Sequence, residues 1–112
     1  MRTLVVGATG FVGRRLVDRL FEAGHEVVAF SRSASRESFP NGVEPADGDL
    51  GDDDSLAGVC EDVAVAYYLI HSLTTDDFAA RDREYARRFR RHASAAGVDR
   101  VIYLSGISGD GA

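Results

Sequence analysis

A glycine loop between an apolar run and a helical pattern constrains the fold of this chain more than any other feature. The segment Gly7–Gly13 reads GATGFVG and directly follows the apolar run Leu4–Val6. From Gly10 to Ala23 apolar residues recur at helical spacing, and Gly24 stands where a left-handed cap would end a helix. A strand, a glycine loop and a helix in this order predict the first βα unit of an α/β domain.

Each glycine of this loop has a physical task. Gly7 permits the tight turn after the strand, Gly10 lets backbone N–H groups approach a pyrophosphate, and Gly13 lets the helix pack closely on the sheet. The N-terminus of the helix adds unpaired donors and the positive end of its dipole. No Gly-Lys-Ser/Thr sequence follows, so the loop is not a P-loop. We predict a nucleotide-binding loop whose contacts come from Gly7, Thr9, Gly10, Phe11, Val12 and Gly13.

The rest of the chain alternates short apolar runs with helical patterns. Further strands are predicted at Val27–Phe30, at Val63–Ile70 and at Val101–Leu104, and a weak one around Val43 that ends near Gly48-Asp49-Leu50. The segments between them are predicted as a loop or short turn over 33–39, a short helix over Asp52–Gly58 and a long helix over Asp76–Ala96. Runs that are apolar throughout are typical of parallel strands covered by helices on both faces. The pattern predicts a doubly wound α/β (Rossmann) fold with the strand order 3-2-1-4-5.

Composition narrows the class of protein further. A chain of 112 residues has room for one domain, and no apolar run approaches the roughly 20 residues that span a bilayer. The net charge of −5 argues against a nucleic-acid binder. The single cysteine, Cys60, excludes an internal disulfide and is expected to pack rather than react, which fits a cytoplasmic protein. No cluster of residues has metal-ligand spacing.

The G-x-x-G-x-x-G spacing resembles the short-chain dehydrogenase/reductase superfamily in its extended and atypical branches, where GATGFVG is a frequent form. Further similar segments are Phe30-Ser31-Arg32, Gly48-Asp49-Leu50, Tyr68-Leu69-Ile70-His71-Ser72 and the stretch from Ala95 to Ser105. The resemblance covers essentially the whole chain and is strongest for NmrA-like NAD(P)H-binding proteins. It implies that residues 1–112 form an NAD(P)-binding domain.

The residues after the second predicted strand bear on the choice of dinucleotide. NAD-binding domains usually place an Asp or Glu there, about 20 residues past the glycines, to bind the ribose 2′-OH. This chain has Ser31-Arg32-Ser33, with no carboxylate before Glu37. Arg32, assisted by a serine hydroxyl, is suited to a forked contact with a 2′-phosphate, although it can also be a solvated loop charge. The sequence therefore favours NADP(H), with NAD(H) as the alternative.

Other basic residues near these segments are weaker candidates. Arg36 is a candidate for a second phosphate contact, and Arg14 and Arg15 are better explained as a solvated helix face.

Residues that follow the third and fourth predicted strands complete the expected site. In the resembled family an Asp at the place of Asp49 contacts the adenine amino group, and Leu50 would add a backbone or apolar contact. Asp49 is equally suited to cap the helix over 52–58. Ile70 and His71 end the fourth strand, where open α/β sheets line their ligand crevice. His71 is suited either to contact the ribose or nicotinamide, or to form hydrogen bonds within the protein at the end of the strand.

The resemblance also bears on catalysis. Active short-chain reductases use a serine at the end of the fifth strand and a Tyr-x-x-x-Lys pair on the next helix. Ser105 matches the serine, either as an active-site hydroxyl or as a simple polar strand end. No tyrosine here has a lysine four residues on, because the chain has no lysine. Two functions stay open: the cofactor domain of an oxidoreductase or epimerase acting on an unknown small molecule, or a non-catalytic NAD(P)H-binding redox sensor or assembly protein.

Two further expectations concern the whole molecule. Without a further βα unit, the fifth predicted strand would be left as an exposed apolar edge of the sheet. Residues 1–112 are therefore expected to be the N-terminal portion of a longer protein. The long predicted helix carries Arg81, Arg83, Arg87, Arg88, Arg90 and Arg91. With acidic residues interleaved, this pattern is typical of a solvated face rather than an anion-binding stripe. Because the corresponding helix of the superfamily often forms a dimer interface, a homodimer is also expected.

Overall fold

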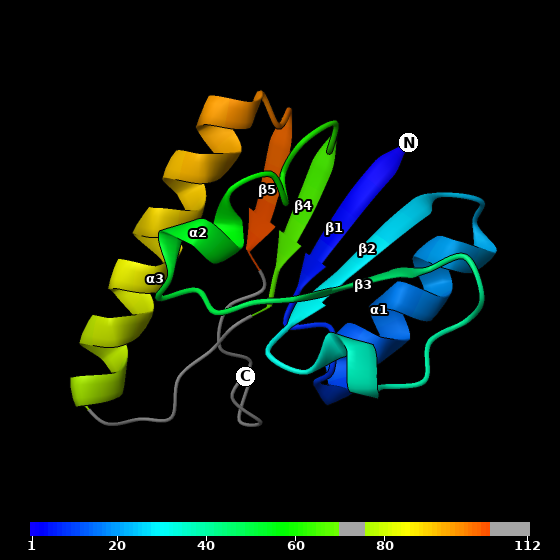
Figure 1. The fold of residues 1–112 in the computed structure, drawn as a ribbon, viewed down its shortest axis with the longest axis horizontal. Coiled ribbons are helices and arrows are strands. Elements are labelled where there is room, and N and C mark those ends of the chain that lie inside the picture. The colour runs from blue at the N-terminus through cyan, green and yellow to red at the C-terminus, as the bar shows by residue number, and fades with distance from the viewer. Residues whose placement is uncertain (70–75, 104–112) are drawn as a thin grey trace.

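The computed structural model describes residues 1–69 and 76–103, and the side chains of all of these except 76–79. They form a parallel sheet in the order β3-β2-β1-β4-β5 (Figure 1). The strands are β1 (Arg2–Val6), β2 (Glu26–Ser31), β3 (Glu44–Asp47), β4 (Val65–Tyr68) and β5 (Arg100–Tyr103). The helical elements are α1 (Phe11–Glu22), the short 3-10 turn η1 (Ala34–Arg36), α2 (Asp53–Leu56) and α3 (Asp76–Ala96). The predicted fold and strand order are confirmed.

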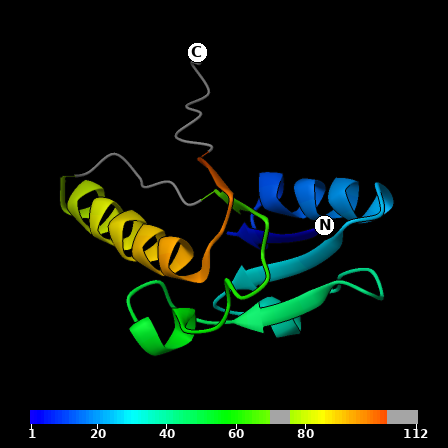
Figure 2. The ribbon, with the colours of Figure 1, turned by 90° about the horizontal axis from the view of Figure 1, so that it is seen from above.

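The two faces of the sheet have separate hydrophobic cores, because successive strand residues point to opposite faces. On β1, Leu4 and Val6 pack in one core with Phe89 of α3. Val5, between them, packs in the other core with Val17 of α1. Accordingly α1 lies on one side of the sheet and α2 and α3 on the other (Figure 2). This arrangement leaves the carboxyl ends of the strands free to carry a site.

The ends of α1 agree with the glycine pattern. Gly10 is its N-cap residue, and Gly24 follows its C-cap with φ +92°, a conformation that favours glycine. The N–H of His25 donates to the Leu20 carbonyl at 3.1 Å, and the N–H of Gly24 donates to the Phe21 carbonyl at 3.0 Å. These bonds satisfy carbonyls that the last turn of a helix leaves unpaired. The predicted cap at Gly24 is confirmed.

The third strand lies next to Val43, where a weak strand was predicted, but it is not a buried strand. It covers Glu44–Asp47, ends just before Gly48, and most of its residues are exposed. The exposure of β3 follows from its place in the sheet, since it pairs with β2 alone and lies at an edge. Pro45, which has no N–H to donate, is tolerated at such an edge. The expectation that every strand is apolar throughout was therefore wrong for β3.

The short helix is shorter than predicted, whereas the long helix has the predicted length. α2 is a single turn, and Asp52 caps it by accepting a hydrogen bond from the N–H of Asp54 at 3.0 Å. α3 has the predicted bounds, and Phe89 and Ala93, which helical spacing places on one face, are both buried. Ala96, predicted by the same spacing to lie on that face, is exposed in the last turn. No helix of the described residues is long and apolar enough to cross a membrane.

Candidate functional site

The glycine loop connects the carboxyl end of β1 to α1 and is held against the neighbouring strand. The N–H groups of Gly7 and Ala8 donate to the Phe30 carbonyl at the end of β2, at 3.0 and 3.3 Å. Gly7 has φ +91°, and its own carbonyl accepts a hydrogen bond from Gly10 at 3.3 Å. A Cβ built on Gly13 would lie 2.1 Å from the Gly7 carbonyl oxygen. The close approach of helix and loop therefore requires glycine at position 13.

The N-terminus of α1 presents backbone donors at this end of the sheet. The first N–H groups of a helix have no acceptor within the helix, and the N-cap residue Gly10 has no side chain to supply one. Gly10 itself is exposed, and a Cβ there would meet no atom closer than the Gly7 oxygen at 3.6 Å. Phe11 and Val12 are 74% and 47% exposed. The loop thus offers an open concentration of N–H donors, suited to an anionic group.

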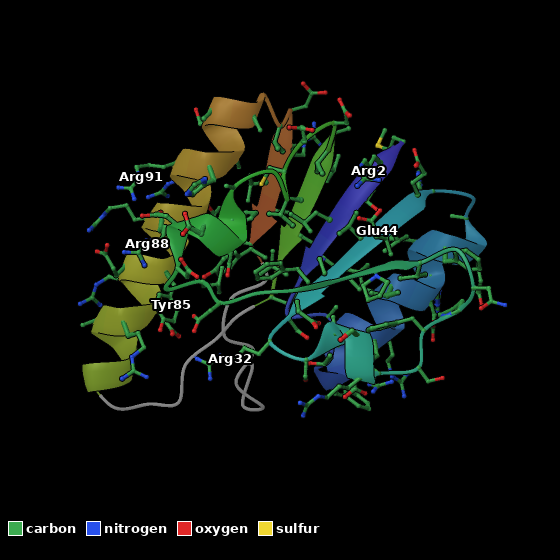
Figure 3. All side chains as sticks on the ribbon, in the orientation of Figure 1. Arg2, Arg32, Glu44, Tyr85, Arg88 and Arg91 are labelled. Carbon is green, nitrogen blue, oxygen red and sulfur yellow. The ribbon has the colours of Figure 1, made fainter. Side chains whose placement is uncertain are left out.

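The loop after β2 carries the predicted basic residue. Ser31 ends the strand, and its hydroxyl oxygen accepts a hydrogen bond from the N–H of Ser33 at 3.2 Å. Arg32, between them, is exposed and lies beyond the carboxyl ends of the strands (Figure 3). Arg32 forms no ion pair with any residue in the described part of the chain. Its guanidinium is therefore available to a ligand.

The carboxylates near this loop are already engaged. Glu37 forms an ion pair with Arg14, whose guanidinium also lies 5.9 Å from the centre of the Phe39 ring. Asp47, at the end of β3, accepts hydrogen bonds from the hydroxyl of Ser35 at 2.5 Å and from its N–H at 2.7 Å. These bonds from Ser35 lower the pKa of the Asp47 carboxyl. Arg14 thus links the loop after β2 to α1, while its side chain stays 43% exposed, as expected of a residue on a solvated helix face.

The segment after β3 holds the predicted adenine-binding residues. Asp49 is exposed, and its Oδ1 accepts a hydrogen bond from the N–H of Gly51 at 2.8 Å. Leu50 is 93% buried in the core between the sheet and α3, so its side chain serves packing. Because Asp52 caps α2, the expectation that Asp49 caps it was wrong.

Arg88 is a residue whose position sequence reasoning missed. Its Nη1 donates to the Leu50 carbonyl at 3.2 Å, and its side chain is 19% exposed. The sequence pattern predicts that all the arginines of α3 lie on a solvated face, and for Arg88 this prediction is wrong. A signal existed: position 88 lies three residues after Tyr85, beside the buried stripe through Phe89, and so at the edge of the face that packs on the protein.

Two buried groups at the core are unsuited to acid–base or nucleophilic work. Burial raises the pKa of the Cys60 thiol to about 11, which leaves almost no thiolate at neutral pH. This burial agrees with the packing role expected of Cys60. Burial likewise raises the pKa of Tyr68, whose ring packs 5.4 Å from that of Phe89 and 5.5 Å from that of Tyr103, measured between ring centres.

Several predicted site residues lie outside the described residues: Ile70, His71 and Ser105. Thr74 and Thr75, either of which is suited by its place in the sequence to cap the start of the helix over Asp76–Ala96, lie outside them as well. Within residues 1–69 and 76–103, no group of three or more His, Cys, Asp or Glu side chains is placed to hold a metal ion.

Comparison with known proteins agrees with this geometry. The family described as NAD(P)H-binding matches residues 7–111. The chain belongs to this family of NAD(P)H-binding domains. The resemblance found from the glycine loop is thereby confirmed.

Two curated relatives and one solved structure illustrate the similarity. Sterol demethylase protein B of Methylococcus capsulatus is 35% identical over 121 aligned positions, covering 99% of this chain and 36% of that protein. Photosystem II assembly factor Ycf39 of Synechocystis is 27% identical over 109 positions, covering 94% and 33%. A short-chain dehydrogenase/reductase superfamily protein from Agrobacterium tumefaciens with bound NAD superposes with a TM-score of 0.74 at 32% identity, covering 92% and 32%. The chain thus spans about a third of the length of these relatives.

Proposed function

We propose that this domain binds NADP(H) in preference to NAD(H), with Arg32 on the 2′-phosphate of the adenosine ribose. The observation that carries the proposal is the exposed guanidinium of Arg32 at the carboxyl end of β2, where NAD-binding domains usually have a carboxylate. The nearby carboxylates of Glu37 and Asp47 are taken up by Arg14 and Ser35. A phosphate therefore meets an unpaired cation here rather than an unpaired anion.

The remaining contacts of the proposed site follow the edge of the sheet. The N–H donors at the start of α1 bind the pyrophosphate, within the loop formed by Gly7, Thr9, Gly10, Phe11, Val12 and Gly13. Ser31 adds a hydroxyl next to the 2′-phosphate. Asp49 and the backbone of Leu50 face the adenine, and Ile70 and His71 contribute beyond β4.

For the whole protein we propose a reductase or epimerase that acts on a small molecule, with Ser105 as an active-site hydroxyl. The dinucleotide supplies hydride transfer when bound, and the residues described here bind and orient it. The second candidate is a non-catalytic protein that binds NAD(P)H and assists assembly of a partner. It is favoured by the similarity to a photosystem II assembly factor.

Titration with NADPH and NADH tests the cofactor assignment. Energy transfer from tyrosine to the reduced nicotinamide reports binding, since the chain has four tyrosines and no tryptophan. We expect Arg32→Ala to weaken NADPH binding about tenfold or more and to leave NADH binding unchanged, as for loss of a hydrogen bond to a charged group. Arg87→Ala removes an equal charge from an exposed site on α3 and should change neither affinity. Equally weak binding of both dinucleotides, unaffected by Arg32→Ala, would refute the 2′-phosphate contact.

A separate experiment distinguishes the two candidate functions. The gene is read beyond codon 112 for a Tyr-x-x-x-Lys sequence on the helix after Ser105, and NADPH oxidation is measured with a panel of aldehydes and ketones. Both the motif and turnover support the reductase. Tight NADPH binding without the motif and without turnover supports the assembly protein.

A further inference from the structure

One arginine of α3 differs from its neighbours in where its side chain lies. The side chains of Arg87 and Arg91 are 62% and 61% exposed, whereas that of Arg88 is 19% exposed. Arg88 and Tyr85 extend from α3 beside the segment that leads into α2 (Figure 3). A guanidinium this buried has lost most of its hydration, and the protein groups around it must replace that hydration.

The groups that replace the lost hydration of the Arg88 guanidinium come from three separate parts of the chain. The Nη1 of Arg88 donates to the Leu50 carbonyl at 3.2 Å. Its Nε lies 3.4 Å from Asp53 Oδ1 of α2, as an ion pair without an aligned hydrogen bond, and its Nη2 lies 3.7 Å from Glu84 Oε2 on α3. The hydrogen bond to Leu50 is therefore the best-aligned of its contacts. It joins α3 to the segment Asp49–Asp52.

The same segment is held from its other sides. The Leu50 side chain is buried in the core, and the phenol of Tyr85 lies so near Gly51 that a Cβ there would be 3.4 Å from the Tyr85 hydroxyl. Asp49 Oδ1 accepts the hydrogen bond from Gly51, and the Asp49 carbonyl accepts one from Asp52 at 3.0 Å. Asp49 Oδ2 accepts no hydrogen bond from the described residues. The segment thus presents one free carboxylate oxygen at the carboxyl end of the sheet.

We propose that Arg88 is a positioning residue for the adenine half of the dinucleotide. By holding the Leu50 carbonyl against α3, it sets the backbone of Asp49–Asp52 so that Asp49 Oδ2 faces the adenine amino group. Arg88 itself does not touch the ligand. The inference rests on the proposed function, because it assumes that adenine binds beside Asp49.

The test measures binding of ADP-ribose and of both dinucleotides to the protein. We expect Arg88→Ala to weaken all three about fivefold, the effect of losing one hydrogen bond, with the ratio of NADPH to NADH affinity unchanged. Arg88→Lys, which keeps a cation able to reach the same carbonyl, should recover part of the loss. Arg87→Ala is the matched control and should bind as the wild type does. Thermal unfolding of each variant shows that it is folded.

A double-mutant cycle separates positioning from general destabilisation. If Arg88 acts through Asp49, then Arg88→Ala has no further effect on ADP-ribose affinity once Asp49→Ala is present. An effect of Arg88→Ala that is as large in the Asp49→Ala background overturns the inference, as does a folded Arg88→Ala protein with wild-type affinity. If Arg32→Ala leaves NADPH affinity unchanged while the effects of Arg88→Ala and Asp49→Ala on ADP-ribose affinity depend on each other, the NADP(H) preference is refuted and the positioning role is supported. A wild-type protein that binds no dinucleotide refutes both.

Discussion

Adding a single methyl group at Gly13 should destabilise the fold, because α1 approaches the glycine loop too closely for a side chain. In Gly13→Ala the new Cβ would lie 2.1 Å from the Gly7 carbonyl oxygen and 2.9 Å from the Ala8 α-carbon. Both neighbours are backbone atoms, so no rotamer change relieves the overlap. To restore van der Waals contact, α1 and the loop must separate by about 1 Å or more.

The magnitude follows from two opposing effects. Overpacking of a core costs about 1–3 kcal/mol, and the backbone overlap at Gly13 places this substitution at the upper end of that range. Alanine is a better helix former than glycine by about 1 kcal/mol, which offsets part of the cost because position 13 lies inside α1. We expect a net loss of about 2 kcal/mol in the free energy of unfolding.

Urea unfolding followed by far-ultraviolet circular dichroism measures this loss. With a slope of about 1–3 kcal/mol per molar urea, the midpoint of Gly13→Ala should fall by roughly 1 M at an unchanged slope. Gly10→Ser is the matched control, since its Cβ meets nothing closer than 3.6 Å and serine is a favoured N-cap. It should keep wild-type stability but weaken NADPH binding, because its side chain occupies the approach to the N–H donors. Wild-type stability in Gly13→Ala, or an equal loss in Gly10→Ser, would refute the reasoning.

Two further predictions concern titratable groups. Burial raises the pKa of the Cys60 thiol from 9.0 to about 11, so at pH 8 the folded protein should react with a disulfide reagent about a hundred times more slowly than the protein unfolded in urea. Rapid labelling of the folded protein would contradict the burial of this thiol. Hydrogen bonding to His92, with Arg88 and Arg91 nearby, lowers the pKa of the Asp53 carboxyl below its ordinary value of 3.8. The resulting stabilisation is complete above that value and is lost as the pH falls through the lowered pKa, so Asp53→Asn should flatten the acid limb of the stability profile below pH 3.8. A limb as steep as that of the wild type would show that other carboxylates produce it.

The sequence predicted the elements whose signal is local. The spacing of Gly7, Gly10 and Gly13 predicted the turn and the start of α1, and the periodicity of α3 predicted both of its ends. Such signals are readable because caps, turns and amphipathic faces depend on residues a few positions apart. The third strand gave only a weak signal because an edge strand needs few apolar residues, and its pairing with β2 determines its bounds.

The amino-acid sequence by itself thus determined the fold class and the dinucleotide-binding loop, since both depend on backbone conformations that only certain local patterns permit. Tertiary structure decided which charged groups are available to a ligand. Glu37 and Asp47 contact side chains from other parts of the chain, whereas Arg32 does not. Arg88, on a helix whose sequence predicts a solvated face, donates a hydrogen bond to the segment after β3. Partners so far apart in sequence meet only when the sheet and its helices are assembled, and no local pattern specifies which of several arginines will find a buried carbonyl.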